Sequence, residues 1–270
     1  MDTYAIERRS RRGERERAAV TAILDAEGIT KRYGHVTALD GASFSANAGE
    51  VTALIGDNGA GKSTLVKVLS GVIGCDGGVI RLEGEPVKLG SPQQARELGI
   101  ETVFQDLALA PELGPAENVF VGREVLKADW RRHLGILDKA RMHREGLEAF
   151  ISMGTDVRDM RAPVATLSGG QRQSVAICRS VMWTNRVLFL DEPTAALGVR
   201  QTRNVLDLVR RVAERGVAVI LISHNMPEVL EVSDRIEVLR LGRRVAQFAR
   251  DATVDQLVGA MTGALEHVDR

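Results

Sequence analysis

The sequence predicts an α/β fold with a mainly parallel core sheet, and three observations support this. Short runs of β-branched and aliphatic residues alternate with helical patterns along most of the chain. Most of these runs are apolar at every position, as expected for strands covered by helices on both faces. Hydrophobic residues make up 44% of the 270 residues, which is enough for a buried core.

The strands of the parallel sheet are expected far apart in the sequence, at residues 51–55, 101–104, 187–190 and 217–222. Other segments predict antiparallel strands beside this sheet. Residues near Thr30, residues 42–46 and residues 77–87 alternate between apolar and polar, with Gly and Pro turns between them. The first part of the chain therefore predicts a separate antiparallel β subdomain.

The middle of the chain has a helical character. Strand patterns are missing over residues 107–165, and ILDKARMHREGLEAFISMG at residues 136–154 has a helical pattern. We expect a helical subdomain, residues 107–180, inserted in the α/β core. After it, RIEVLRLGRRVAQF at residues 235–248 predicts a closing hairpin, and a helix is expected at residues 254–261.

Residues 23–265 are expected to form one domain between two short ends. Residues 1–22 contain six arginines interspersed with glutamates, which indicates a solvated, disordered basic leader. A contact of this leader with anionic lipid or RNA is the alternative. Residues 266–270 are expected to be a tail.

Composition excludes several classes of protein. Lys+Arg and Asp+Glu both number 36, and zero net charge argues against a nucleic-acid binder. Two cysteines are too few for a disulfide framework or a zinc site, so a reducing compartment is expected. No secretory signal is expected, and no apolar run approaches the roughly 18 residues that cross a membrane.

The stretch GDNGAGKST, residues 56–64, follows an apolar strand and has the spacing of a phosphate-binding loop. Its glycines let N–H groups point at phosphate oxygens, and the next helix presents its positive end. Lys62 suits the β- and γ-phosphates, and Ser63 suits Mg²⁺. A glycine-rich turn without a ligand is the alternative. The predicted nucleotide-binding residues of the loop are Gly56, Asp57, Asn58, Gly59, Ala60, Gly61, Lys62, Ser63 and Thr64.

Two more motifs point to phosphate chemistry. In VLFLDEP, residues 187–193, an apolar strand leads to Asp191 for Mg²⁺ and Glu192 for polarising water, although an ordinary strand end is the alternative. In LSGGQRQ, residues 167–173, a small glycine-containing turn begins a helix, which makes a second helix N-terminus suited to an anion.

With these three motifs, residues 23–263 resemble the ATP-binding subunit of an ABC transporter. The resemblance implies ATP and Mg²⁺ as cofactors and a dimer of two identical chains that meet head to tail. The P-loop of one chain and the LSGGQ turn of the other would hold each ATP. The residues that would bind ATP across the dimer are Ser168, Gly169, Gly170 and Gln171.

The resemblance also assigns roles outside these motifs. Tyr33, in KRYG, resembles the aromatic residue that stacks on adenine; Gln105, in VFQD, resembles the Q-loop glutamine; His224, in ISHN, resembles the switch histidine. Purely structural roles are the alternatives for all three. The resemblance thus implies Glu192, His224 and Gln105 as catalytic residues and Ser63, Gln105 and Asp191 as Mg²⁺ ligands.

One position departs from the family pattern. Gly198 stands in the D-loop where an aspartate is usual, which leaves the D-loop's contact across the dimer open. The wording of residues 192–201 and 221–229 resembles importers of monosaccharides, nearest the fructose type. That resemblance implies peripheral attachment at the cytoplasmic face of the plasma membrane, a transmembrane permease partner and, indirectly, a sugar-binding protein, with no nucleic acid.

Three other functions stay open from the sequence. The chain could serve an ABC system for another substrate, act as a soluble ABC ATPase of DNA repair or translation, or bind ATP without hydrolysing it. The transported sugar itself cannot be read from these residues.

Overall fold

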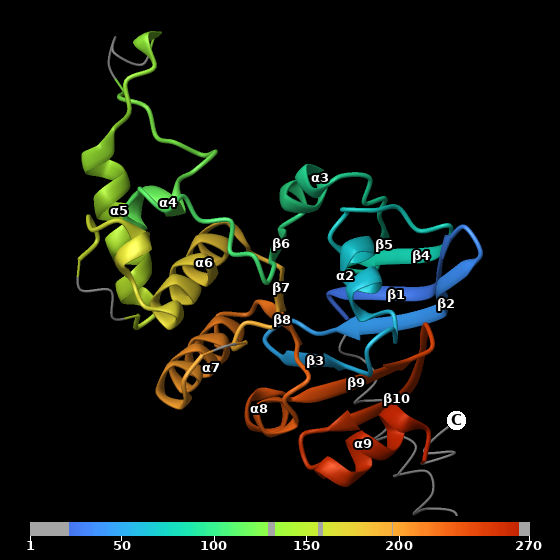
Figure 1. The fold of residues 1–270 in the computed structure, drawn as a ribbon. Helices are drawn as coiled ribbons and strands as arrows, with labels where there is room; N and C mark the ends of the chain where they lie inside the picture. Colours follow the sequence, from blue (N-terminus) through green and yellow to red (C-terminus); the bar gives the residue numbers. More distant parts are fainter. Residues whose placement is uncertain (1–21, 129–132, 156–158, 196, 265–270) are drawn as a thin grey trace, which may run out of the picture.

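The computed structural model describes residues 22–128, 133–155, 159–195 and 197–264 (Figure 1). The expected leader and tail therefore lie outside the described residues, apart from Ala22. The described chain forms a six-stranded sheet with the order β10-β9-β3-β8-β7-β6 and a four-stranded sheet with the order β2-β1-β4-β5.

The six-stranded sheet is the predicted parallel core. All its neighbouring strands pair in parallel except β9 and β10, which form the predicted closing hairpin. Every residue of β3 and β8 is buried, as expected for strands covered on both faces. The strands are β3 (Val51–Ile55), β6 (Ile100–Val103), β7 (Val187–Asp191), β8 (Ala218–Ile222), β9 (Arg235–Arg240) and β10 (Arg243–Ala249).

The second sheet is the predicted antiparallel one. It consists of β1 (Leu24–Tyr33), β2 (Val36–Ala46), β4 (Gly77–Leu82) and β5 (Glu85–Pro86). Helix α2 (Lys62–Leu69) packs its apolar side into a core shared by both sheets, which includes Phe44 from β2 and Phe189 from β7. This core fixes the start of α2 relative to both sheets.

The remaining helices lie between the strands in sequence or follow the last one. Helices α4 (Pro115–Val119), α5 (Lys139–Ser152) and α6 (Gly169–Trp183) lie between β6 and β7 in sequence, where the helical subdomain was expected, and stand to one side in Figure 1. The division of the chain into subdomains stays a prediction. The other helices are α3 (Pro92–Glu97), α7 (Val199–Glu214), α8 (Met226–Val232) and α9 (Val254–Thr262).

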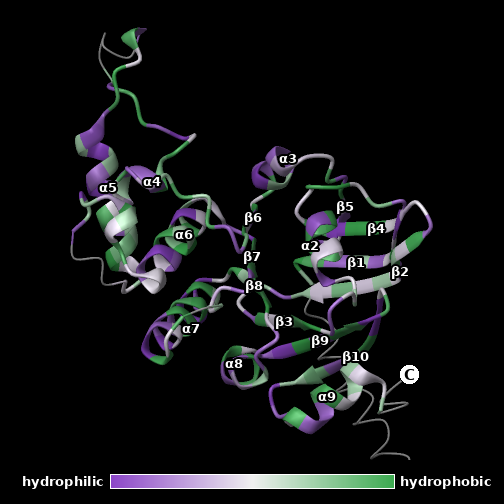
Figure 2. Ribbon diagram, viewed as in Figure 1, coloured by the Kyte–Doolittle hydropathy of each residue, from purple (hydrophilic) through white to green (hydrophobic). Residues whose placement is uncertain are grey.

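Helix α7 is amphipathic. Helix α7 carries both polar and apolar residues in Figure 2, and its apolar residues, such as Val205 and Val209, pack against the core sheet. Cys75 and Cys178 are both free. Within the described residues, no helix is both long and apolar enough to span a bilayer.

Candidate functional site

Four neighbouring parallel strands end at one edge of the core sheet, and each leads into a predicted site residue. The P-loop follows β3, His224 follows β8, Asp191 ends β7, and Gln105 lies two residues after β6. Because the carboxyl ends of parallel strands share an edge, residues far apart in sequence are gathered there. The sheet order β3-β8-β7-β6 is therefore what assembles the site.

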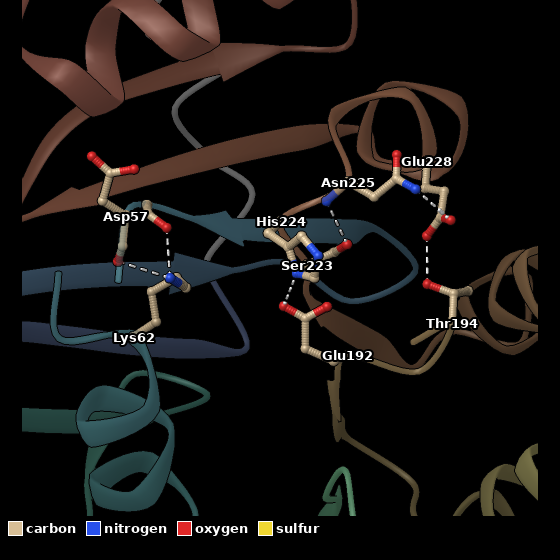
Figure 3. Close-up of polar contacts among 9 residues, drawn as sticks. Asp57, Lys62, Glu192, Thr194, Ser223, His224, Asn225 and Glu228 are labelled. Carbon is tan, nitrogen blue, oxygen red and sulfur yellow. Dashed lines mark hydrogen bonds and ion pairs between the residues drawn. The ribbon is translucent and has the colours of Figure 1, made fainter. Parts of the chain in front are cut away.

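The P-loop turns tightly between β3 and α2. A Cβ atom at Gly56 would lie 2.2 Å from the carbonyl oxygen of Leu239, so only glycine fits. Lys62 is the first residue of α2, and its Nζ donates to the carbonyl oxygens of Gly56, at 2.5 Å, and Asp57, at 3.0 Å (Figure 3). Asp57 and Asn58 are exposed, so the outer surface of the loop is open to a ligand.

The charges at this edge act on one another. Burial lowers the pKa of Lys62, while the carboxylates of Glu192, Asp57 and Asp191 oppose that lowering. Burial and the neighbouring Glu192 raise the pKa of Asp191, against the opposing charge of Lys62. Two adjacent carboxylates share one nearby ammonium, and an additional cation would stabilise their charged forms.

The donors at the edge suit Mg²⁺. Ser63 offers a hydroxyl, Gln105 an amide oxygen and Asp191 a carboxylate, all of them hard oxygen donors. No group of three or more His, Cys, Asp or Glu residues is arranged as a metal site within the described ranges. Mg²⁺ is commonly bound by one or two protein carboxylates together with substrate phosphates, and Asp191 would supply such a carboxylate.

Glu192 and His224 come together beside the P-loop. Glu192 Oε1 lies 2.8 Å from His224 Nδ1, with the Glu192 side chain 19% exposed and that of His224 76% exposed (Figure 3). The Glu192 backbone N–H donates to Ile222 O at 2.9 Å, and its φ of +50° is rare for a residue with a side chain. The neighbouring strand thus holds Glu192 in a strained turn.

Tyr33 ends β1 and is 49% exposed, so its ring is accessible to a base. A brace that the sequence did not reveal holds this strand end. Lys31 Nζ lies 5.9 Å from the Tyr33 ring centroid and 2.9 Å from Asp76 Oδ1, and the Arg32 N–H donates to Asp76 Oδ2 at 2.7 Å. Asp76 is distant in sequence, so only the pairing of β1 with β4 could have revealed it.

The LSGGQ turn begins α6 as predicted. Ser168 is the N-cap: its Oγ accepts from Gln171 N at 3.3 Å, and Gln171 Oε1 accepts from Ser168 N at 3.0 Å. A Cβ atom at Gly170 would lie 2.9 Å from Gln201 Cβ, so the turn rests on the first turn of α7. Helices α6 and α2 lie apart in Figure 1, with β6, β7 and β8 between them. The structure therefore does not bring this turn to the P-loop of the same chain.

The sequence pattern of the ABC transporter family matches residues 39–195. The chain belongs to the ABC transporter family. Among relatives in this family, the fructose import ATP-binding protein of Rhizobium meliloti is 49% identical, over 90% of this chain and 95% of that protein. The xylose/arabinose import ATP-binding protein of Sulfolobus acidocaldarius is 42% identical, over 89% of this chain and 94% of its own.

Another relative and two solved structures also support membership of the ABC transporter family. The ribose import ATP-binding protein 1 of Rubrobacter xylanophilus is 45% identical, and this chain spans 47% of its length. The solved structure of a nucleotide-free ATP-binding cassette from an ABC transporter superposes with a TM-score of 0.74 at 28% identity, over 84% of this chain and 91% of that one. A Clostridium perfringens protein described as part of an ABC transporter complex gives 0.72 at 26% identity, over 88% and 91%.

The sequence did not predict a group of polar residues beside the Glu192–His224 pair, namely Thr194, Asn225 and Glu228. Glu228, in the first turn of α8, accepts from Thr194 Oγ1 and, at 2.7 Å, from Asn225 Nδ2 (Figure 3). An acid in a first helical turn is common because it complements the helix dipole, so nothing in the sequence distinguishes Glu228 from other such acids.

Proposed function

We propose that this chain is the ATP-binding and ATP-hydrolysing subunit of an ABC importer for a monosaccharide. One observation carries the hydrolytic part: Glu192 contacts His224 at the sheet edge where Lys62 begins α2. The proposed base Glu192, the proposed orienting residue His224 and the proposed phosphate-binding residue Lys62 thus lie at the same edge of the sheet.

In this proposal the P-loop binds the phosphates of ATP through its backbone N–H groups and the positive end of α2. Lys62 exchanges its contacts with Gly56 O and Asp57 O for the β- and γ-phosphates. Glu192 orients the attacking water and accepts its proton, and His224 keeps the Glu192 carboxylate in place. Bound Mg²⁺, held by Ser63, Gln105 and Asp191, would neutralise developing charge on the phosphates.

A second copy of the chain completes the site. Ser168 is exposed at the N-terminus of α6, and α6 lies apart from α2 of its own chain. A head-to-tail dimer would place the Ser168–Gln171 turn of one chain against the ATP on the other. Residues 23–265 are proposed to act as one ATP-binding domain within this dimer.

The membrane partner is proposed to dock beside the helical region. A cavity of about 300 Å³ lies between β6, α4 and α6, lined by residues that include Arg96, Glu101, Arg123 and Trp183. The cavity is lined by Thr102 and Ala108, on either side of Gln105. A permease that moves in this cavity would therefore shift Gln105 and change the ATP site. The proposed location is accordingly the cytoplasmic face of the plasma membrane, with a sugar-binding protein acting through the permease.

The substrate class is supported by the relatives, which are named for import of fructose, ribose and xylose or arabinose. The test is uptake of radiolabelled fructose, ribose and xylose by native cells that lack the chain. Loss of uptake of one sugar, restored by the wild-type chain and not by Lys62→Ala, is the expected result. Normal uptake of every monosaccharide tested in the deletion strain would contradict the proposal of sugar import.

A further inference from the structure

The two loops that carry Glu192 and His224 are joined at two places. The first is the last bond of the strand ladder, from Glu192 N to Ile222 O at 2.9 Å. The second lies beyond the Glu192–His224 contact, where Thr194 of one loop and Asn225 of the other both donate to the carboxylate of Glu228. The contact between Glu192 and His224 thus lies between two bridges, of which Figure 3 shows the one through Glu228.

The second bridge is partly buried, with Asn225 at its exposed end. Thr194 is 7% exposed, and Glu228 is half-buried on α8. A carboxylate can accept from both loops at once, one through each oxygen. On the side of the His224 loop, Asn225 N also donates to Ser223 Oγ at 3.1 Å, which ties that loop to itself.

From this geometry we propose that Glu228 is a positioning residue for ATP hydrolysis. It fixes the distance between Glu192 and His224 by holding Thr194 and Asn225, and it does not itself touch ATP. The inference rests on the proposed function, since it concerns how the proposed base is held. A displaced base loses catalytic power, whereas ATP binding at Lys62 does not depend on the bridge.

The test measures steady-state ATP hydrolysis by the assembled transporter. Glu228→Ala is expected to lower kcat by about tenfold or more, because a small misplacement of a catalytic group is costly. Its KM for ATP is expected to stay within about twofold of the wild type, since uniform binding is not affected. Glu231→Ala is the matched control, because Glu231 is exposed on the same helix, and its kcat is expected to match the wild type.

A second measurement separates positioning from general destabilisation. Thr194→Val removes one hydroxyl of the bridge, and in the double variant with Glu228→Ala its effect is expected to disappear, because both changes break the same bridge. Glu228→Gln keeps the shape and part of the hydrogen bonding, so an intermediate kcat is expected. If thermal melting shows that Glu228→Ala does not fold, the Glu228→Gln variant provides the test instead.

Several results would overturn the positioning role. A wild-type kcat in Glu228→Ala is one, and independent, multiplicative effects of the Thr194 and Glu228 changes are another. If Lys62→Ala abolishes turnover in the same preparation, such results reject only the positioning role of Glu228 and leave the proposed ATPase function in place. If the wild-type transporter itself hydrolyses no ATP, the proposed function fails first.

Discussion

His224 Nδ1 lies 2.8 Å from Glu192 Oε1, and the two residues follow the ends of the adjacent parallel strands β8 and β7. The register of these strands pairs Asp191 with Ile222, so each side chain emerges just beyond the last paired residues. The contact therefore depends on the core sheet more than on either loop.

The first prediction concerns this pair. Glu192→Gln is expected to lower kcat for ATP hydrolysis by about 100-fold or more, because the amide cannot accept a proton from water. ATP binding is expected to remain, and size-exclusion chromatography with ATP should detect a trapped dimer. Turnover at the wild-type rate would remove Glu192 as the base.

Lys62 gives a second prediction. Lys62→Ala is expected to weaken ATP binding by about 10- to 100-fold, since hydrogen bonds to a charged group are lost. Titration with a fluorescent ATP analogue measures this. Lys67→Ala is the matched control, because Lys67 lies exposed in the last turn of the same helix. Unchanged affinity in Lys62→Ala would contradict the assignment of the P-loop.

The LSGGQ turn gives a third prediction. Ser168→Arg is expected to abolish hydrolysis, because a large side chain at the N-cap of α6 would block the approach of the second chain. The isolated chain should bind ATP as tightly as the wild type, which titration of dilute protein can measure. Full hydrolysis by Ser168→Arg would mean that the turn takes no part in the site.

A fourth prediction concerns stability and pH. Glu237, on β9, is 1% exposed, and burial raises its pKa above the ordinary 4.5 despite Arg244 and Arg235 nearby. A raised pKa means that Glu237 favours folding below about pH 4.5 and that this contribution is lost as the pH rises through the raised value.

Glu237→Gln should therefore raise the free energy of unfolding by about 1 kcal/mol at pH 8 and leave it nearly unchanged at pH 4. Urea denaturation at both pH values measures this, with Glu231→Gln as the exposed control. Destabilisation by Glu237→Gln at pH 8 would mean that the ion pairs with the two arginines outweigh the cost of burial.

Much of the fold could be predicted because local patterns decide it. The apolar run at residues 51–55 became β3 with the same bounds, and the hairpin turned at Leu241 and Gly242. The strand expected at residues 101–104 lies one residue earlier, which leaves Phe104 outside it. Such boundary errors are small because periodicity identifies an element better than its ends.

The candidate site residues could be named from the sequence, but the geometry that brings some of them together could not. Nothing local in the sequence says that β8 lies between β3 and β7, and that order is what brings His224 to Glu192. The bridge through Glu228 and the brace through Asp76 were missed for the same reason. Each joins residues whose proximity comes only from strand pairing.

The close packing of the LSGGQ turn on α7 has a wider consequence. Gly169 faces Leu197 and Gly170 faces Gln201, and Leu197 belongs to the loop that leads from Glu192 into α7. In the proposed dimer, rearrangement of that loop during turnover would therefore shift the turn that the same chain offers to its partner. In a two-chain assembly, the state of one bound nucleotide would alter the affinity for the other, and we expect cooperative ATP kinetics.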